Sequence, residues 1–262
     1  MSDTTSLPHM KHQNKIALVT GSSRGLGRNI ALKLAASGAD VVVTYRSGKE
    51  EGEAVAAEIK ALGRKAAVLR IDTGKTETFD AFAEALKELL ASVWQRADFD
   101  FLVNNAGIDS AAPYAETTEA AFDDLMNVHF KGVFFLTQRL LPLLADGGRI
   151  VNTSTGLARF CVSGYAAYAS MKGAIEVLSR YMAKELGGRG ITVNVVAPGA
   201  IETDFTKAAL AHAGVKEFLA ANTTLGRVGV PDDIGGVVDF LCSEDARWVN
   251  AQRLEASGGM FL

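Results

Sequence analysis

The sequence predicts one α/β domain, a doubly wound parallel sheet of about seven strands with helices on both faces. Short apolar runs rich in β-branched residues alternate with longer amphipathic segments along the chain, and this alternation is typical of right-handed βαβ units. The chain has 262 residues, of which 48% are hydrophobic, so it can fill one large core. No Pro/Ser-rich linker divides it into separate domains.

Hydrophobic periodicity predicts the order of the elements. Apolar runs predict strands at 16–20, 41–45, 67–71, 101–104, 149–153, 192–196 and 253–255. Amphipathic patterns predict helices at 25–37, 49–62, 76–95, 118–144, 165–187 and 231–243. Pro231, followed by Asp232 and Asp233, favours a helix start, because a first helical turn tolerates proline and attracts negative charge.

Two segments fall outside this alternation. Residues 1–14 are polar and are expected to form a disordered lead-in to a single domain at 15–262. The segment 200–225 follows the sixth strand and carries small residues with weak helix signals. We expect it to be a mobile substrate lid of two short helices.

Composition argues against several classes of protein. A net charge of −3 and a pI near 5.9 give no reason to expect nucleic acid or an anionic membrane as partner. The apolar stretch 130–144 is too short to cross a bilayer, and the N-terminus lacks the core of a signal peptide. Two cysteines cannot form a disulfide scaffold, and the four histidines show no metal-ligand spacing. We therefore expect a cytoplasmic protein without a metal site.

A glycine-rich turn follows the first strand, from Thr20 to Gly27. Its spacing, Gly-x-x-x-Gly-x-Gly, lets backbone N–H groups approach a pyrophosphate at the positive end of the next helix. Such a turn can also be a plain surface loop. Its position between a strand and a helix favours dinucleotide binding by Gly21, Ser23, Arg24, Gly25, Leu26 and Gly27.

The end of the second strand indicates which dinucleotide binds. An acidic residue there would bind the ribose 2′-hydroxyl of NAD and repel a 2′-phosphate. This strand ends instead in Tyr45, Arg46 and Ser47, and Arg24 lies in the glycine turn. Two guanidinium groups around one phosphate favour NADP(H) over NAD.

The segment from Tyr168 to Lys172 predicts the catalytic chemistry. On a helix the two side chains lie one turn apart, and a nearby ammonium favours the phenolate and lowers the pKa of the phenol. A tyrosine tuned in this way can act as a general acid or base. The spacing alone proves little, because Tyr45 and Lys49 repeat it outside any helix. The hydroxyl of Ser154, after the fifth strand, is the expected partner.

Together these motifs resemble those of the short-chain dehydrogenase/reductase family, from Lys15 to the C-terminus. The further matches, in the same order, are Asn104 to Gly107, Asn127, and Pro198 to Thr203. The resemblance implies a Rossmann-like fold and an NADP-dependent oxidoreductase.

The resemblance also implies four catalytic roles. Tyr168 would donate a proton to a substrate carbonyl, and Ser154 would orient that carbonyl oxygen. Lys172 would lower the tyrosine pKa and bind the nicotinamide ribose. Asn127 would hold a water that connects the lysine with solvent, although it could also be a buried polar residue that satisfies backbone groups.

Other residues are implied as cofactor contacts: Asp72, Thr73, Asn105, Ala106, Gly107, Pro198, Gly199, Ile201 and Thr203. Asp72 could instead cap the following helix, and Asn105 could instead brace the sheet. A mostly apolar pocket is expected from Ile108, Leu157, Arg159, Phe160, Cys161, Val162 and Phe205.

Within the family, the two arginines and the chain end from Ser257 to Leu262 look most like the 3-oxoacyl-carrier-protein reductases and related ketone reductases. A small ketone or an acyl thioester is the expected substrate, with acyl carrier protein as a candidate partner. Basic candidates for carrier docking are Lys131, Arg139, Arg159 and Lys184, but residues 140–144 offer no charge. This missing charge puts the carrier-protein substrate in doubt, while the apolar pocket favours a hydrophobic ketone or an acyl chain over a sugar.

The sequence leaves alternatives for the reaction, for catalysis itself and for the oligomeric state. An NAD-dependent alcohol or sugar dehydrogenase of the same family is one alternative, and a catalytically silent NADP-binding sensor is another. Apolar side chains on the helices at 118–144 and 165–187, Phe134 and Leu140 among them, predict a homo-oligomer. A tetramer built on these two helices is expected, with a dimer as the alternative.

Overall fold

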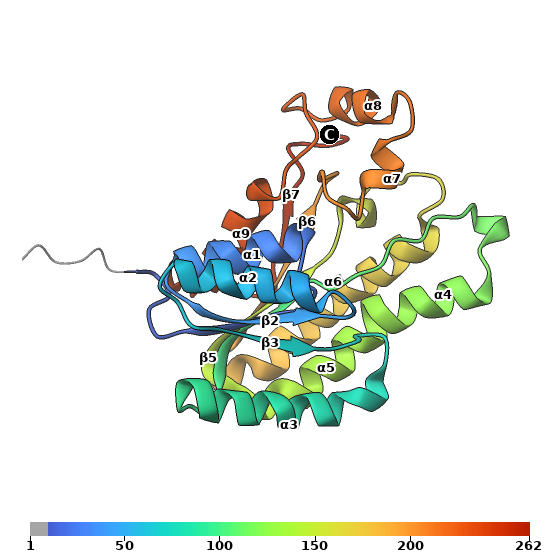
Figure 1. The fold of residues 1–262 in the computed structure, drawn as a ribbon. Helices are drawn as coiled ribbons and strands as arrows, with labels where there is room; N and C mark the ends of the chain where they lie inside the picture. The colour runs from blue at the N-terminus through green and yellow to red at the C-terminus, as the bar shows by residue number, and fades with distance from the viewer. Residues whose placement is uncertain (1–9) are drawn as a thin grey trace, which may run out of the picture.

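A computed structural model describes residues 10–262 and confirms the predicted doubly wound sheet (Figure 1). All neighbouring strands are parallel, and their order in the sheet is β3-β2-β1-β4-β5-β6-β7. Their bounds are β1 Ile16–Val19, β2 Asp40–Tyr45, β3 Ala66–Arg70, β4 Phe99–Asn104, β5 Leu144–Thr153, β6 Thr192–Pro198 and β7 Arg253–Ala256.

Helices cover both faces of the sheet. One layer contains α1 Gly25–Ala36, α2 Lys49–Ala61 and α9 Asp232–Cys242. The opposite layer contains α3 Phe79–Leu89, α4 Glu119–Met126, α5 Gly132–Leu140 and α6 Ala166–Leu186. Within residues 10–262, no helix combines the length and the apolar character needed to cross a membrane.

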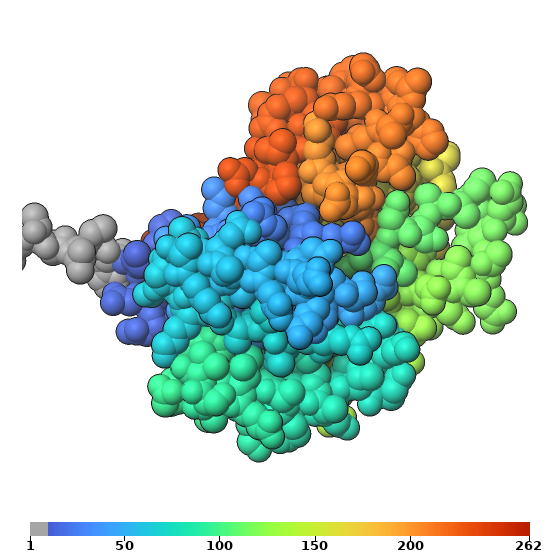
Figure 2. All heavy atoms as spheres, in the orientation of Figure 1, coloured from blue at the N-terminus to red at the C-terminus, as the bar shows by residue number. Residues whose placement is uncertain are grey.

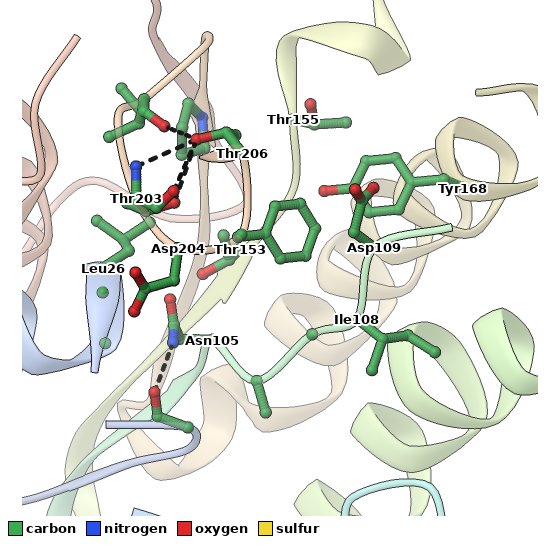
Figure 3. A pocket seen from close by; sticks show the side chains of 18 of the residues that line it. Leu26, Asn105, Ile108, Asp109, Thr153, Thr155, Tyr168, Thr203, Asp204 and Thr206 are labelled. Atoms are coloured by element: carbon green, nitrogen blue, oxygen red, sulfur yellow. Dashed lines mark hydrogen bonds between the residues drawn. The ribbon is translucent and has the colours of Figure 1, made fainter. Parts of the chain in front are cut away.

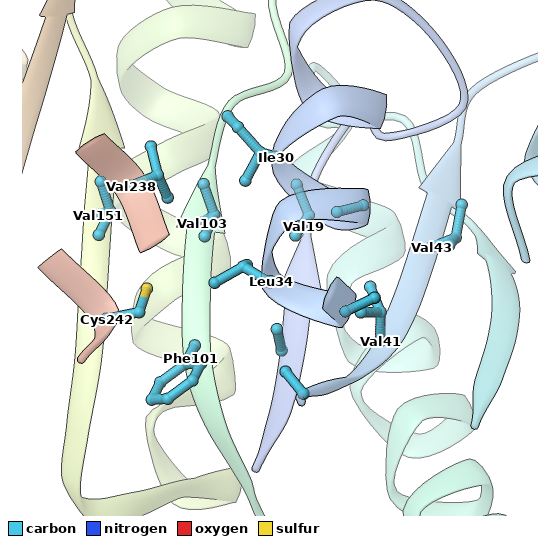
Figure 4. Packing of buried hydrophobic residues seen from close by; sticks show 14 of the residues in the cluster. Val19, Ile30, Leu34, Val41, Val43, Phe101, Val103, Val151, Val238 and Cys242 are labelled. Atoms are coloured by element: carbon cyan, nitrogen blue, oxygen red, sulfur yellow. The ribbon is translucent and has the colours of Figure 1, made fainter. Parts of the chain in front are cut away.

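Apolar side chains fill the space between each helix layer and the sheet. On the α1 side, Ile30 and Leu34 are fully buried in the cluster that contains Val19 and Val103 of the sheet (Figure 4). Val238 belongs to α9 and joins the same cluster. A separate buried cluster lies under α3, α5 and α6. Because both faces of the strands are covered, the strands read as continuous apolar runs in the sequence.

The strand order reverses between β1 and β4, and this is where an open α/β sheet forms a ligand crevice. Thr20, directly after β1, ties the two loops at this point together. Its Oγ1 accepts the N–H groups of Asn105 and Ala106 at 2.9 and 3.0 Å. The loops that follow β1 and β4 therefore form one rigid edge of the crevice.

The segment after β6 forms the two short helices expected from the sequence, α7 Lys207–Leu210 and α8 Val215–Ala221. In Figure 2 this orange segment stands as a raised lobe above the blue N-terminal part. The C-terminal end of the chain contacts this segment directly after α8, where the Phe261 N–H donates to the Asn222 carbonyl at 2.8 Å. Movement of this lid remains a prediction.

The structure corrects the predicted disordered lead-in at residues 1–14. Residues 1–9 lie outside the described residues, but residues 11–14 form turns. His12 is fully buried there, and its Nε2 lies 2.9 Å from Oδ1 of Asp239 on α9. This buried pair fastens residues 11–14 to the domain, a long-range contact that local composition could not reveal.

The helix predicted at 118–144 is also corrected. A π-helical turn, Asn127–Lys131, separates α4 from α5. The helix ends in a 3-10 turn at Leu141–Leu143, where Pro142 lies, and β5 begins at Leu144. A π turn inserts an extra residue into the helical repeat, so it rotates the side chains that follow it.

Candidate active site

A cavity of about 600 Å³ opens at the carboxyl ends of the central strands, beneath the lid (Figure 3). One part, called the cofactor half here, is lined by the glycine turn and by the loops after β2, β3 and β4. Every residue predicted to contact the cofactor lines the cavity: Gly21, Ser23, Arg24, Gly25, Leu26, Gly27, Tyr45, Arg46, Ser47, Asp72, Thr73, Asn105, Ala106, Gly107, Tyr168, Lys172, Pro198, Gly199, Ile201 and Thr203.

The glycine turn requires glycine at two points for different reasons. Gly21 has a φ of +65°, a left-handed conformation that side chains disfavour. A Cβ on Gly27 would lie 2.3 Å from the Gly21 carbonyl oxygen, so the helix approaches the turn too closely for any side chain. The resulting cradle at the N-terminus of α1 fits a pyrophosphate.

Two predicted cofactor contacts also brace loops, Asn105 in the way considered from the sequence and Asp72 by capping a turn and not the following helix, whose N-cap is Thr78. The Asn105 side-chain amide donates to the Thr20 carbonyl at 3.1 Å. The Asp72 carboxylate accepts the N–H of Gly74 at 3.0 Å and so caps the turn after β3. Both residues hold loops that form the wall of the cofactor half.

The guanidinium groups of Arg24 and Arg46 are unpaired within residues 10–262, whereas nearby Arg28 contacts Glu58 at 2.5 Å. Unpaired arginines at a cavity wall are free to bind a phosphate. Glu51, in the first turn of α2, also lines this part of the cavity. This acidic residue was not predicted as part of the cofactor site.

Tyr168 lies in the middle of the cavity wall, on α6. The residue is 9% exposed, and its ring packs edge-to-face on His129 at 5.1 Å between centroids. Burial, and then the nearby Asp109 carboxylate, raise the pKa of the phenol above its ordinary value, while hydrogen bonding with Thr155 lowers it. The phenol is therefore protonated at neutral pH.

Lys172 follows one turn later on α6, as expected. Its Nζ donates to the Thr153 carbonyl at 2.7 Å and lies 5.8 Å from the centroid of the Tyr168 ring. Burial lowers the pKa of Lys172 to about 7. The pKa of the phenol is thus raised and not lowered as predicted, because burial and Asp109 act on it and Lys172 is not among the groups that shift it.

The hydroxyl beside Tyr168 belongs to Thr155, not to Ser154 as predicted. Ser154 is 2% exposed, and its Oγ donates to Oε1 of Glu176 at 2.7 Å. Both Ser154 and Thr155 line the cavity, but only the Thr155 hydroxyl acts on the Tyr168 phenol. Successive side chains of an extended segment point to opposite sides, so a one-residue error in choosing the hydroxyl reverses its direction. The adjacent Ser-Thr pair was the only signal in the sequence.

Asn127 begins the π turn but does not line the cavity, where Val128 and His129 lie, and its role in holding a water stays a prediction. Nε2 of His129 lies 2.8 Å from the carbonyl oxygen and 3.2 Å from the amide nitrogen of Ile108. Burial first, and the charge of Lys172 second, lower the pKa of His129 to about 3. His129 is thus a neutral brace, directed inward by the π turn.

The remaining part of the cavity, called the substrate half here, is lined by five of the seven residues predicted for it: Ile108, Leu157, Phe160, Val162 and Phe205. The other two predictions are wrong. Cys161 is exposed and lies outside the wall. Arg159 turns away from the cavity to Glu255, with contacts of 2.8 and 2.6 Å, and to the Met260 carbonyl at 2.7 Å.

Several lining residues were missed because they come from distant segments. They are Asp109 and Tyr165, lid residues such as Phe218 and Leu219, and Met260 from the chain end. Phe261 stacks between Phe160 and Phe218, at 4.8 and 6.1 Å between ring centroids. The C-terminal tail therefore joins the lid to the loop after β5.

This geometry agrees with comparisons to known proteins. A family model described as Enoyl-(Acyl carrier protein) reductase matches residues 21–261. The chain belongs to the short-chain dehydrogenase/reductase family.

Curated relatives span the whole domain. An oxidoreductase of Methylorubrum extorquens, named Uncharacterized oxidoreductase MexAM1_META1p0182, is 40% identical over 95% of this chain and 99% of its own length. The hydroxynaphthalene reductase-like protein Arp2 of Metarhizium brunneum is 38% identical over 94% of each chain. The 3-oxoacyl-[acyl-carrier-protein] reductase FabG of Staphylococcus epidermidis is 38% identical over 95% of this chain and all of its own.

The solved structures include the angucycline C-6 ketoreductase LanV with bound NADP. It is 40% identical, covers 96% of this chain and 97% of its own, and superposes with a TM-score of 0.91. The predicted preference of this chain for NADP(H) agrees with the cofactor of that short-chain dehydrogenase/reductase.

A polar network in this short-chain dehydrogenase/reductase holds the segment that carries Thr155. Arg253 of β7 donates to the Thr155 carbonyl at 3.1 Å, to Glu176 at 2.6 Å and to Glu255 at 2.8 Å. Glu176 is the same carboxylate that binds Ser154. The network therefore holds the main chain at Ser154 and Thr155 in place behind the cavity wall. Within residues 10–262, no cluster of three or more His, Cys, Asp or Glu side chains is suited to a metal ion.

Proposed function

We propose that this enzyme uses NADPH to reduce the carbonyl group of a hydrophobic ketone to a secondary alcohol, with Tyr168 as the general acid. The cavity wall that holds both the Tyr168 phenol and the Thr155 hydroxyl carries the proposal. Both groups lie in the same cavity as the glycine cradle, where a reacting carbonyl and a dinucleotide could meet.

Bound NADPH supplies the hydride that adds to the carbonyl carbon. The carbonyl oxygen gains negative charge at that moment, and the Tyr168 phenol gives it a proton. The Thr155 hydroxyl donates a hydrogen bond that orients the same oxygen. A raised phenol pKa keeps the acid protonated at neutral pH, which suits it to donate a proton during reduction.

Lys172 is proposed to bind the nicotinamide ribose through its ammonium group. With a pKa near 7, its charge state changes with modest changes of environment. The neutral His129 cannot supply protons at this pH, so we assign it the role of holding the Ile108 backbone.

NADP(H) is the proposed cofactor because Arg24 and Arg46 offer two unpaired guanidinium groups to a 2′-phosphate. The bound NADP of LanV, and of a Burkholderia cenocepacia short chain dehydrogenase that is 36% identical, supports this choice. The carboxylate of Glu51 opposes it only in part, since one acid faces two arginines.

The choice of a free ketone over an acyl-carrier-protein thioester rests on charge. Two of the basic residues considered for carrier docking are engaged within the chain, Arg139 with Asp80 at 2.7 Å and Arg159 with Glu255 at 2.6 Å. The aromatic lining of the substrate half favours a compact apolar ring system. Relatives named for hydroxynaphthalene and angucycline chemistry point the same way, whereas FabG supports the thioester.

A homotetramer is the proposed assembly. An apolar groove lies between α5 and α6, with Phe134 and Tyr181 exposed by 38% and 64%. Leu140, expected on this face, is instead fully buried. A second copy of α5 and α6 would cover the groove.

The direct test follows the absorbance of NADPH with a panel of bicyclic ketones, simple ketones and β-ketoacyl thioesters. We expect turnover with the bicyclic ketones, and a loss of kcat of about 100- to 10,000-fold in Tyr168→Phe, with a much smaller change in NADPH affinity. Equal turnover of Tyr168→Phe would refute the catalytic role. Tight NADPH binding without turnover of any carbonyl would instead indicate the silent sensor.

A further inference from the structure

Asp109 is a carboxylate in the wall of the substrate half that the proposed reaction does not use. It follows Ile108 in the loop after β4, and its side chain lies beside Tyr168 in the cavity (Figure 3). Its negative charge raises the pKa of both Tyr165 and Tyr168, so the carboxylate is close to both phenols.

The loop that carries Asp109 is fixed at two points. Nε2 of His129 lies 2.8 Å from the carbonyl oxygen and 3.2 Å from the amide nitrogen of the preceding Ile108, so either tautomer makes one hydrogen bond to this backbone. Further along, the Ala112 N–H donates to the Gly164 carbonyl at 2.9 Å, next to Tyr165. A buried side chain and the segment before α6 therefore hold this carboxylate beside the reactive phenol.

No basic side chain within residues 10–262 pairs with Asp109. Asp109 is an exposed residue of the open cavity, its carboxylate accepts the N–H of neighbouring Ser110, and partial burial raises the pKa of the carboxyl above its ordinary value. In contrast, the carboxylates behind the cavity are fully engaged, as Glu255 binds Arg159, Arg253 and Ser257. Asp109 therefore keeps acceptor capacity directed at whatever occupies the cavity.

Aromatic side chains line the cavity that contains Asp109. Tyr165, Phe205, Phe160 and Phe218 line the cavity together with Tyr168. Tyr165 and Phe205 lie 6.3 and 6.2 Å from the Tyr168 ring between centroids. These spacings suit a flat ring system in contact with several aromatic faces.

We propose that Asp109 is a specificity-determining residue that selects aromatic ketones carrying a hydroxyl group, by accepting a hydrogen bond from that hydroxyl. The inference rests on the proposed ketone reduction and names its substrate class. A carboxylate that is desolvated by a bound ring system needs a donor in return, so a substrate without one leaves a buried charge unsatisfied.

The sign of the charge narrows the class further. A carboxylated substrate would be repelled by Asp109 at close range. An ammonium substrate would bring a second cation into the cavity that holds Lys172. A neutral hydroxyl satisfies Asp109 without either penalty.

The first experiment compares a hydroxylated bicyclic aryl ketone with its methyl ether, in wild type, Asp109→Asn and Asp109→Leu. A hydrogen bond to a charged group is worth about 1.5–3 kcal/mol, so wild type should prefer the hydroxylated ketone by about 10- to 100-fold in kcat/KM. The preference should shrink in Asp109→Asn and vanish in Asp109→Leu. Asp204→Asn removes a different carboxylate of the same cavity and should preserve the preference.

A second readout separates binding from general damage. The groups that face Tyr168 are Asp109, Tyr165, Thr155, His129 and Lys172, and only the first carries a negative charge at neutral pH. Asp109→Asn should therefore lower the pKa of Tyr168, which moves the alkaline limb of the kcat profile to lower pH. Thermal melting of the NADP-loaded variants checks that each one folds.

Four outcomes decide the inference. A preference for the hydroxylated ketone that depends on Asp109 supports it, whereas equal kcat/KM for both ketones in wild type overturns it. An Asp109-dependent preference for an ammonium ketone over the hydroxylated one replaces the hydroxyl by a cation and also overturns it. If no ketone turns over, calorimetric binding of the same pair to the NADP-loaded protein still tests Asp109, and the proposed reaction alone fails.

Discussion

The cofactor half and the substrate half of the cavity are built from different parts of the chain. The cofactor half uses backbone turns at the strand ends, such as the Gly21 to Gly27 cradle, and Thr20 joins two of these turns. The substrate half uses side chains from the π turn, the loop after β5, the lid and the tail. Backbone turns require particular residues at particular places, whereas a side-chain wall can be assembled from many sequences.

Sequence motifs therefore predict the cofactor half more accurately than the substrate half. Every predicted cofactor contact lines the cavity, but Ser154, Arg159 and Cys161 do not fill the roles expected of them. The hydroxyl that acts on Tyr168 lies one residue along the chain from the predicted one. Four experiments test this contrast, beginning with the largest expected effect.

Removal of the Thr155 hydroxyl tests the substrate half. Thr155→Val should lower kcat by about 100- to 1,000-fold, because the carbonyl oxygen loses its second donor. Ser154→Ala should cost less than about tenfold, since the Ser154 hydroxyl already serves Glu176. Steady-state kinetics with Thr155→Ser as a control, which keeps the hydroxyl, makes the measurement. A larger loss in Ser154→Ala than in Thr155→Val would restore the original assignment.

The two unpaired arginines test the cofactor half. The double change of Arg24 and Arg46 to Ala should weaken NADPH binding by about 10- to 100-fold, because charge-assisted contacts to the phosphate are lost. NADH binding should change less than about threefold. Calorimetric titration measures both, and Arg180→Ala is the matched control, since Arg180 is exposed and unpaired but lies outside the cavity. An equal loss for NADH would show that the arginines do not read the 2′-phosphate.

Lys172 links both halves and should make stability depend on pH. Its folded pKa of about 7 lies below the ordinary 10.5, so the unfolded chain binds more protons between these values. The free energy of unfolding should therefore rise with pH from 7 towards 10, by at most about 1.4 kcal/mol per pH unit, and fall as pH drops to 7. Urea unfolding at pH 7, 8 and 9 should show this slope reduced in Lys172→Met. An unchanged slope would mean that Lys172 remains a normal, solvated ammonium.

The smallest effect concerns Glu51, the acid within the cofactor half. Glu51→Gln should tighten NADPH binding by about two- to fivefold, because one repulsive charge near the phosphate is removed. The same titration measures it, with Glu53→Gln on the same helix as the control. Weaker binding in Glu51→Gln would instead make the carboxylate a direct hydrogen-bond partner of the cofactor.

Much of the fold was predictable because it follows from local periodicity. Each expected strand and each expected major helix is present within a few residues of its predicted bounds, apart from the π turns at Leu90–Trp94 and Asn127–Lys131, which interrupt two predicted helices, and the early start of β5. Buried parallel strands and amphipathic helices leave a repeating pattern in the sequence. His12 shows the limit, since its burial depends on Asp239, far away in the chain.

The sequence by itself determined the doubly wound sheet and the dinucleotide cradle, because β-branched runs and glycines act through their own backbone. Only the tertiary structure decided which hydroxyl meets Tyr168, which side chain the π turn directs inward, and that Asp109 faces the reactive phenol. Side-chain direction reverses with a shift of one residue in an extended segment and rotates with one extra residue in a helix. The direction of these side chains depends on how distant elements pack together, and a local sequence pattern does not contain that information.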